Sequence, residues 1–139
     1  MKVERLDVTT IYVKDLDKAM KFFSDLFETE FLEPWPTMMD TRETVDRRWG
    51  INLATPLTPD GVSSKVMASK GEGLITTGFK VPNLDEAVAE MKSRGIKLVA
   101  REKIGAGEYA CFHPSDTFGA MILLVEYKEE NLAAACASK

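Results

Sequence analysis

Apolar and polar residues follow a strand pattern and then a helix pattern in the first third of the chain. Residues 5–13 are rich in β-branched and aromatic side chains, which is typical of a strand. From 16 to 27 the apolar residues recur at the spacing of one helix face, and Asp15 is the expected N-cap. Strand character returns at 49–54, whereas the polar stretch at 37–48 is ambiguous.

The second half of the chain repeats this order. Residues 74–81 predict a strand and 84–91 predict a helix, which Asn83 and Glu86 would cap at capping-box spacing. Gly95 is expected to end that helix in a left-handed conformation. Further strands are expected at 96–101, 107–113 and 120–127.

The two halves match at one constant sequence offset, which indicates an internal repeat. The matching pairs are Val13 and Val81, Leu16 and Leu84, Asp17 and Asp85, Ala19 and Ala87, and Phe23 and Met91. We therefore predict one α+β domain over 1–139, made of two βαβββ modules. Its parts are module one at 1–56, a linker at 57–72, module two at 73–127 and a short C-terminal tail at 128–139. Because a half-sheet with one helix leaves a face uncovered, the modules should pair into a curved, barrel-like sheet with helices outside and a cleft inside.

Composition excludes several classes of protein. The 139 residues carry 18 Lys and Arg against 22 Asp and Glu, a formal charge of −4, and no basic cluster of the kind that binds nucleic acid. No run of apolar residues approaches the length of a membrane span. The charged start at residues 1–5 does not resemble a signal peptide, and two cysteines make no disulfide framework, so we expect a cytoplasmic protein. A single histidine is too few for a multi-histidine metal site.

The module order and three motifs resemble the vicinal-oxygen-chelate superfamily, which includes glyoxalase I, bleomycin-resistance proteins and extradiol dioxygenases. The resemblance is strongest to its methylmalonyl-CoA epimerases. The motifs are Val-Lys-Asp-Leu-Asp-Lys-Ala at 13–19, Pro-Leu-Thr-Pro-Asp-Gly at 56–61 followed by Lys-Gly-Glu-Gly-Leu at 70–74, and His-Pro-Ser-Asp-Thr-Phe-Gly at 113–119. The resemblance also implies a homodimer.

Family enzymes hold a metal with four inward side chains, typically His, Gln or Glu, His and Glu. The resemblance places these positions on Val8, Asn52, Thr76 and Leu123. Two of these side chains have no donor atom and two offer only neutral oxygens, which are weak ligands for Zn²⁺, Co²⁺ or Fe²⁺. We therefore expect no metal and no cofactor. The family's proton-abstracting Glu falls near Trp35, and the spacing of neither Glu33 nor Glu43 matches it.

These observations favour a glyoxalase-like and bleomycin-resistance-like protein that binds an apolar or aromatic small molecule in its cleft without a metal. The expected ligand-binding residues are Val8, Thr10, Tyr12, Trp35, Met39, Arg48, Trp49, Asn52, Thr76, Lys80, Met121 and Leu123, and catalytic residues stay unassigned. The alternative is a metal-independent enzyme resembling the epimerases, an isomerase, lyase or cyclase acting on a carboxylate or CoA thioester. A third possibility is an interaction module whose own Met and Trp side chains fill the cleft.

Three groups of side chains have two interpretations each. Trp49 either belongs to the core or joins Trp35 in a lid, and the methionines at 38–39 fit a lid or a dimer interface. Arg48 either clamps a carboxylate or belongs to a solvated charged run at 40–48 that includes Asp46. His113 is either a general acid–base or, more simply, a turn residue.

Overall fold

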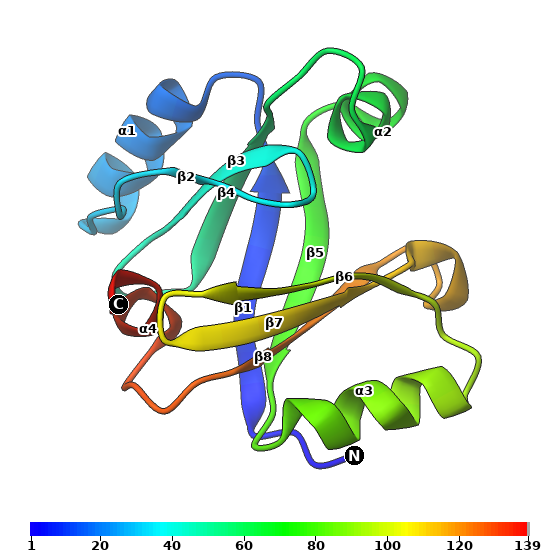
Figure 1. The fold of residues 1–139 in the computed structure, drawn as a ribbon. Coiled ribbons are helices and arrows are strands. Elements are labelled where there is room, and N and C mark those ends of the chain that lie inside the picture. Colours follow the sequence, from blue (N-terminus) through cyan, green and yellow to red (C-terminus); the bar gives the residue numbers. More distant parts are fainter. Residues whose placement is uncertain (139) are drawn as a thin grey trace. The chain divides into compact units, whose positions relative to one another are not determined.

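The computed structural model describes residues 1–138, which contain eight strands and four helices (Figure 1). The first part holds β1 (Arg5–Tyr12), α1 (Leu16–Phe27), β2 (Trp35–Pro36), β3 (Thr41–Val45), β4 (Ile51–Pro56) and α2 (Val62–Lys70). The second part holds β5 (Gly73–Lys80), α3 (Leu84–Ser93), β6 (Leu98–Ile104), β7 (Gly107–Phe112), a 3₁₀ turn at Pro114–Asp116, β8 (Met121–Glu126) and α4 (Leu132–Ala137). The α+β class and both βαβββ orders are confirmed. None of these helices is long and apolar enough to cross a membrane.

The chain divides into two compact units that do not coincide with the two predicted modules. The middle unit is Thr9–Ile75, and the split unit combines Met1–Val8 with the residues from Thr76 onward. Strands β1 and β5 therefore each contribute to both units. The stretch predicted as a linker contains helix α2, which the apolar pattern did not predict.

In the middle unit, β1 pairs in parallel with β4, and β3 pairs antiparallel with both β4 and β2. Helix α1 covers one face of this sheet, where Val13, Leu16 and Leu53 form a core with Ile11 and Phe23 against it. Asp15 caps the helix by accepting a hydrogen bond from the Lys18 N–H at 3.0 Å, as predicted. Helix α2 supplies Val66 and Met67 to a second small core around Tyr12, Ala54 and Ile75.

In the split unit, β5 pairs in parallel with β8, and β7 lies antiparallel between β8 and β6. Helix α3 packs on this sheet through a core that contains Val81, Leu84, Met91, Phe112 and Leu124. Asn83 caps α3 through the Glu86 N–H, and Gly95 follows the helix with a φ of +78°, as the sequence predicts.

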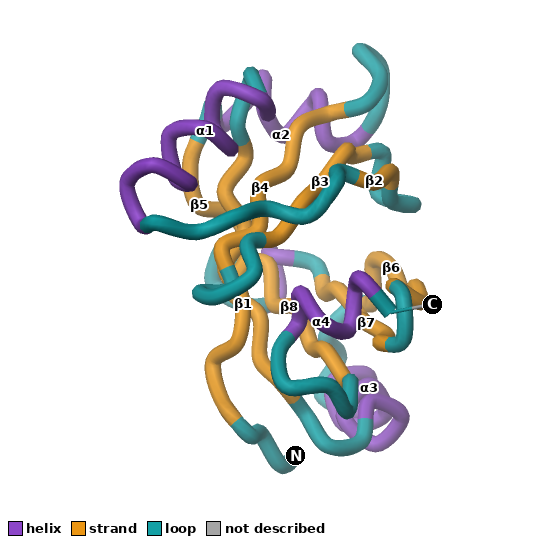
Figure 2. The backbone as a smooth tube through the Cα atoms, turned by 90° about the vertical axis from the view of Figure 1, so that its left-hand side faces the viewer, coloured by secondary structure: helices purple, strands orange, loops and turns teal. Residues whose placement is uncertain are grey.

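The C-terminal tail is helical at Leu132–Ala137 and packs against β7 near its turn with β6 (Figure 2). The Ala106 N–H in that turn donates to the Ala135 carbonyl oxygen at 2.9 Å. A Cβ atom on Gly105 would lie 2.2 Å from the same oxygen, so this turn requires glycine. Backbone contacts therefore anchor α4 to this turn.

Candidate functional site

One face of the middle unit's sheet carries the polar side chains that sequence analysis placed in the cleft. Cα pairing sets Thr10 opposite Asn52, Tyr12 opposite Ala54, and Ala54 opposite Glu43. Trp35 is in turn opposite Glu43 across β2 and β3. Since directly opposed residues project to the same side of a sheet, all of these side chains share one face. Helix α1 lies on the other face, where Ile11 and Leu53 point.

Glu43 is held on this face by two neighbouring side chains. The Asn52 amide Nδ2 donates to Glu43 Oε2 at 3.2 Å and to Thr10 Oγ1 at 3.1 Å. The Thr41 hydroxyl donates to Glu43 Oε1 at 2.9 Å. Thr10 is 4% exposed and Asn52 7%, whereas Glu43 is only partly buried. The result is a positioned carboxylate, which is the group needed to accept a proton from a substrate. Its sequence spacing did not match that of the family's proton-abstracting Glu, but the pairing of β3 with β4 places Glu43 beside Asn52.

Tyr12 has a packing role under helix α2. Its ring is buried against Ala54 and Ile75, and its hydroxyl lies 3.3 Å from Ser63 Oγ. Because Ser63 Oγ donates its hydrogen to the Met39 carbonyl at 2.7 Å, Tyr12 is the donor in the Tyr12–Ser63 bond. This chain of bonds fixes Met39, which is half-buried, at the start of the loop before β3.

The structure decides some of the interpretations offered for the stretch at 34–49. Trp49 is 62% exposed, so its assignment to the core was wrong. Met38 and Arg48 are also exposed, and the exposure of Arg48 agrees with its place in a solvated charged run. Trp35 is half-buried, and its indole Nε1 is fully buried without a hydrogen-bond partner in the described residues.

Asp46 is only 1% exposed, so its place in a solvated charged run was wrong. Its Oδ2 accepts hydrogen bonds from the Thr29 hydroxyl and from the backbone N–H groups of Arg48 and Trp49, at 2.8–3.0 Å. Its Oδ1 accepts from the Ile51 N–H at 2.8 Å. A buried carboxylate with four donors is a structural acceptor that fixes the turn into β4.

In the split unit, the side chains at three of the family's metal positions lie on one sheet face. Thr76 is paired with Met121, and Gly78 with Leu123. A Cβ atom on Gly78 would lie 2.3 Å from Val8 Cγ1 and 3.3 Å from Leu123 Cδ2. The side chains of Val8 and Leu123 therefore both lie next to Gly78, and the atoms that face it are carbons, which cannot ligate a metal.

The donor atoms at these positions do not fit a transition metal. Val8 and Leu123 present only carbon, Thr76 a hydroxyl and Asn52, in the middle unit, a neutral amide oxygen. Among the residues described, no group of three or more His, Cys, Asp or Glu side chains could hold a metal ion. No step of the chemistry below is therefore assigned to a metal.

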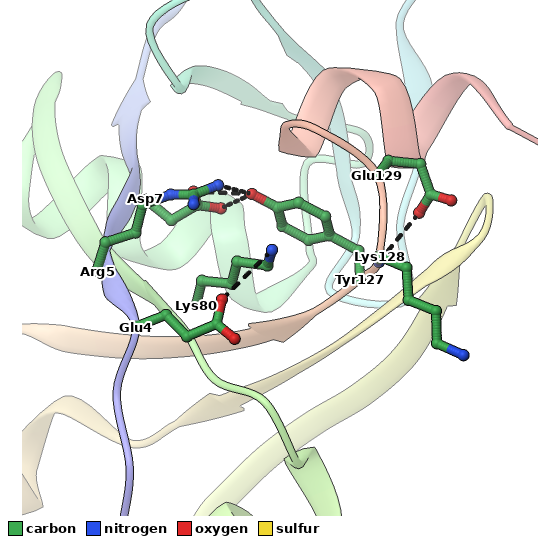
Figure 3. A network of polar contacts seen from close by, with 7 residues as sticks. All are labelled: Glu4, Arg5, Asp7, Lys80, Tyr127, Lys128 and Glu129. Atoms are coloured by element: carbon green, nitrogen blue, oxygen red, sulfur yellow. Dashed lines mark hydrogen bonds and ion pairs between the residues drawn. The ribbon is translucent and has the colours of Figure 1, made fainter.

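Lys80 lies in a charged network that sequence analysis missed (Figure 3). Its ammonium is 3.4 Å from the Glu4 carboxylate and 4.2 Å from the centre of the Tyr127 ring. The Tyr127 hydroxyl donates to Asp7 at 2.8 Å and accepts from Arg5 at 2.8 Å. Burial and the Asp7 carboxylate raise the pKa of Tyr127 well above its usual value of 10. The network borders a hollow of about 800 Å³ next to the β6–β7 turn.

His113 and two residues of β7 have structural roles. His113 Nδ1 accepts from the Ser115 N–H at 3.1 Å and so caps the 3₁₀ turn, which confirms the turn interpretation. The Tyr109 hydroxyl donates to Glu102 at 2.6 Å, across β6 and β7. Cys111 is buried within β7, as expected for a small apolar residue.

Comparison with known proteins gives consistent matches. The family model of the Glyoxalase/Bleomycin resistance protein/Dioxygenase superfamily matches residues 9–112. Mitochondrial methylmalonyl-CoA epimerase from Bos taurus is 31% identical over 127 residues, covering 86% of this chain and 73% of the relative. The crystal structure of methylmalonyl-CoA epimerase from Mycobacterium tuberculosis superposes with a TM-score of 0.80 at 29% identity, covering 96% of this chain and 93% of the other.

A Streptomyces coelicolor methylmalonyl-CoA epimerase in complex with 2-nitronate-propionyl-CoA also has a TM-score of 0.80. It is 21% identical and covers 92% of this chain and 100% of the other. At this identity the likeness establishes the shared fold alone.

Proposed function

Because the chain belongs to the glyoxalase/bleomycin resistance protein/dioxygenase superfamily, we propose that it is a metal-independent enzyme of the epimerase type. Its reaction is proton transfer at the carbon next to the carbonyl of a carboxylate or CoA thioester. The similarity to methylmalonyl-CoA epimerases in sequence and fold supports this enzymatic reading over ligand binding alone. The observation that carries the proposal is the Glu43 carboxylate, positioned by Asn52 and Thr41.

Glu43 acts as the general base in this proposal. One of its carboxylate oxygens forms a bond to the α-proton, and the electron pair of the broken C–H bond moves into the carbonyl to give an enolate. Returning the proton to either face of the carbon completes an exchange or an epimerisation, with no net oxidation or reduction. A positioned base contributes about 10²–10⁴-fold to such a step. Asn52 and Thr41 keep the carboxylate in place by donating to one oxygen each.

Solvent exchange tests the proposal directly. The protein is incubated in D₂O with a panel of acyl-CoA thioesters and short carboxylic acids, and deuterium at the α-carbon is followed by mass spectrometry. We expect exchange that survives treatment with a chelator and falls about 100-fold in Glu43→Gln. Glu33→Gln, at an exposed glutamate near β2, is the matched control and should exchange normally. A wild-type protein that exchanges no member of the panel would refute the proposal.

Binding without catalysis is the second candidate function. It is supported by the apolar side chains of Val8, Met121 and Leu123 on one sheet face of the split unit. An apolar ligand gains roughly 25 cal/mol per Å² of buried apolar surface on such a lining. Titration with aromatic compounds, followed by tryptophan fluorescence, separates the two functions: saturable quenching without any α-carbon exchange would favour binding alone. Light scattering of the purified protein tests the homodimer that the family resemblance implies.

A further inference from the structure

The indole nitrogen of Trp35 is a buried hydrogen-bond donor that no protein atom satisfies in residues 1–138. The ring as a whole is only half-buried, so the nitrogen is enclosed while part of the ring reaches the surface. Buried donors are almost always paired, because an unpaired one loses its hydrogen bond to water and gains nothing in return. An exception of this kind calls for an explanation, and a missing ligand atom is one.

Trp35 is the direct cross-strand neighbour of Glu43. Directly opposed residues on antiparallel strands have their Cβ atoms about 5 Å apart and project to the same face. On its other side Glu43 is opposed by Ala54, which is buried under helix α2 with Val66 and Met67. The carboxylate and the indole therefore flank the same part of the face. A substrate bound on this face would meet both side chains.

Other donors near Glu43 are already engaged. Both hydrogens of the Asn52 amide are used, one on Thr10 and one on Glu43. The Thr41 hydroxyl donates to Glu43, and the Tyr12 hydroxyl donates to Ser63. Among these donors only the Trp35 N–H has no acceptor in the part of the chain that the structure describes, and its residue is the cross-strand neighbour of Glu43.

We propose that the Trp35 indole N–H donates a hydrogen bond to the substrate's carbonyl oxygen as negative charge develops there. This inference rests on the proposed proton transfer and deepens it. As Glu43 takes the α-proton, the electron pair moves onto the carbonyl oxygen, and the indole stabilises the resulting enolate. The substrate class is therefore one with a carbonyl oxygen directly next to the acidic carbon. A preorganised donor of this kind replaces the electrostatic aid that a metal provides in related sites.

Trp35→Phe keeps an aromatic ring and removes the donor. We expect kcat for α-carbon exchange to fall about 10²–10³-fold, as on removal of an oxyanion donor, with KM changed less than about threefold. Phe22→Leu, at an exposed ring of helix α1 on the other side of the sheet, is the control and should leave both constants unchanged. If Trp35→Phe exchanges within threefold of the wild type, the inference is overturned.

A second measurement does not depend on the folding of Trp35→Phe. In Trp49→Phe protein, the single indole ¹H–¹⁵N resonance is recorded while 2-nitronate-propionyl-CoA, an enolate mimic, is added. A downfield shift of the proton and slower exchange with water are the expected results. The mimic could bind tightly and leave this resonance unmoved, while α-carbon exchange still requires Glu43. That result would overturn this inference and leave the proposed function standing. If the mimic does not bind and no substrate exchanges, the proposed function fails and this inference fails with it.

Discussion

A methyl group at position 78 should destabilise the protein by an amount that depends on Val8. A Cβ there would lie 2.3 Å from Val8 Cγ1, 3.2 Å from the Val8 carbonyl oxygen and 3.3 Å from Leu123 Cδ2, all below the 3.4–4 Å of ordinary contact. Val8 is 1% exposed and has no open space into which to retreat. Forcing one extra methyl group into such a site costs about 1–3 kcal/mol, which is the expected loss for Gly78→Ala.

Val8→Ala removes the atom responsible for the worst overlap. On its own it deletes two buried methyl groups and should cost about 1.5–2 kcal/mol. In the double variant the new methyl group at 78 occupies part of the space that Val8 leaves. The double variant should therefore be more stable than the sum of the single changes predicts, by about 1 kcal/mol. Full rescue is not expected, because the Val8 carbonyl oxygen is backbone and stays at 3.2 Å.

Urea denaturation followed by circular dichroism measures all four proteins of this cycle. With a slope of about 1–3 kcal/mol per M of urea for small proteins, a loss of about 1–3 kcal/mol shifts the urea midpoint enough to be resolved for Gly78→Ala. Leu6→Ala, at an exposed position of β1, is the control and should change stability by less than about 0.5 kcal/mol. A Gly78→Ala protein as stable as the wild type, or strictly additive energies in the cycle, would contradict the close approach of β1 and β5 in the split unit.

Three further predictions follow from hydrogen bonds outside the catalytic set. Asp46→Ala should lower the free energy of unfolding by about 3 kcal/mol or more, because three N–H groups and a hydroxyl lose their acceptor; an effect below 1 kcal/mol in urea denaturation would be inconsistent with this. Since folding raises the pKa of Tyr127, the stabilising contribution of this side chain is complete below pH 10 and declines as the pH rises towards the folded pKa. The free energy of unfolding of Tyr127→Phe should therefore fall less steeply at alkaline pH than that of the wild type. Parallel plots of unfolding free energy against pH for the two proteins would refute the assignment. His113→Ala should lower the free energy of unfolding by about 1 kcal/mol, because the cap of the 3₁₀ turn is lost, and should leave α-carbon exchange unchanged. Loss of exchange in a folded His113→Ala protein would instead indicate a catalytic role for His113.

The order of elements was predictable because it depends on short-range periodicity and caps. Asp15, Asn83 and Gly95 act at the helix ends where their residue types indicate. Helix α2 was not predicted, since only Val66 and Met67 of its residues pack into a core and its serines and lysines resemble a loop. Tertiary contacts, rather than an apolar stripe, make this segment helical.

The site was only partly predictable because it depends on strand register. Thr10 and Asn52 were placed together by alternation and motif spacing, and they are hydrogen-bonded in the structure. Glu43 was discounted by residue counting, but the turn between β3 and β4 brings it beside Asn52. That turn depends on the buried Asp46 and on Gly50, which has a φ of +76°. Neither the burial of a carboxylate nor an unpaired indole nitrogen leaves a signature in a single sequence.

Residues 1–8 belong to the same compact unit as the residues from Thr76 onward, and this has a consequence for synthesis of the protein. The Glu4 N–H donates to the Lys80 carbonyl, and Arg5 and Asp7 bond a tyrosine 120 or more residues away. When a ribosome makes the chain, Arg5 and Asp7 cannot contact Tyr127 until residue 127 has left the ribosome. The Thr9–Ile75 unit, whose contacts are closer in sequence, can assemble during that interval, so residues 1–8 should become protected from proteolysis later than this unit.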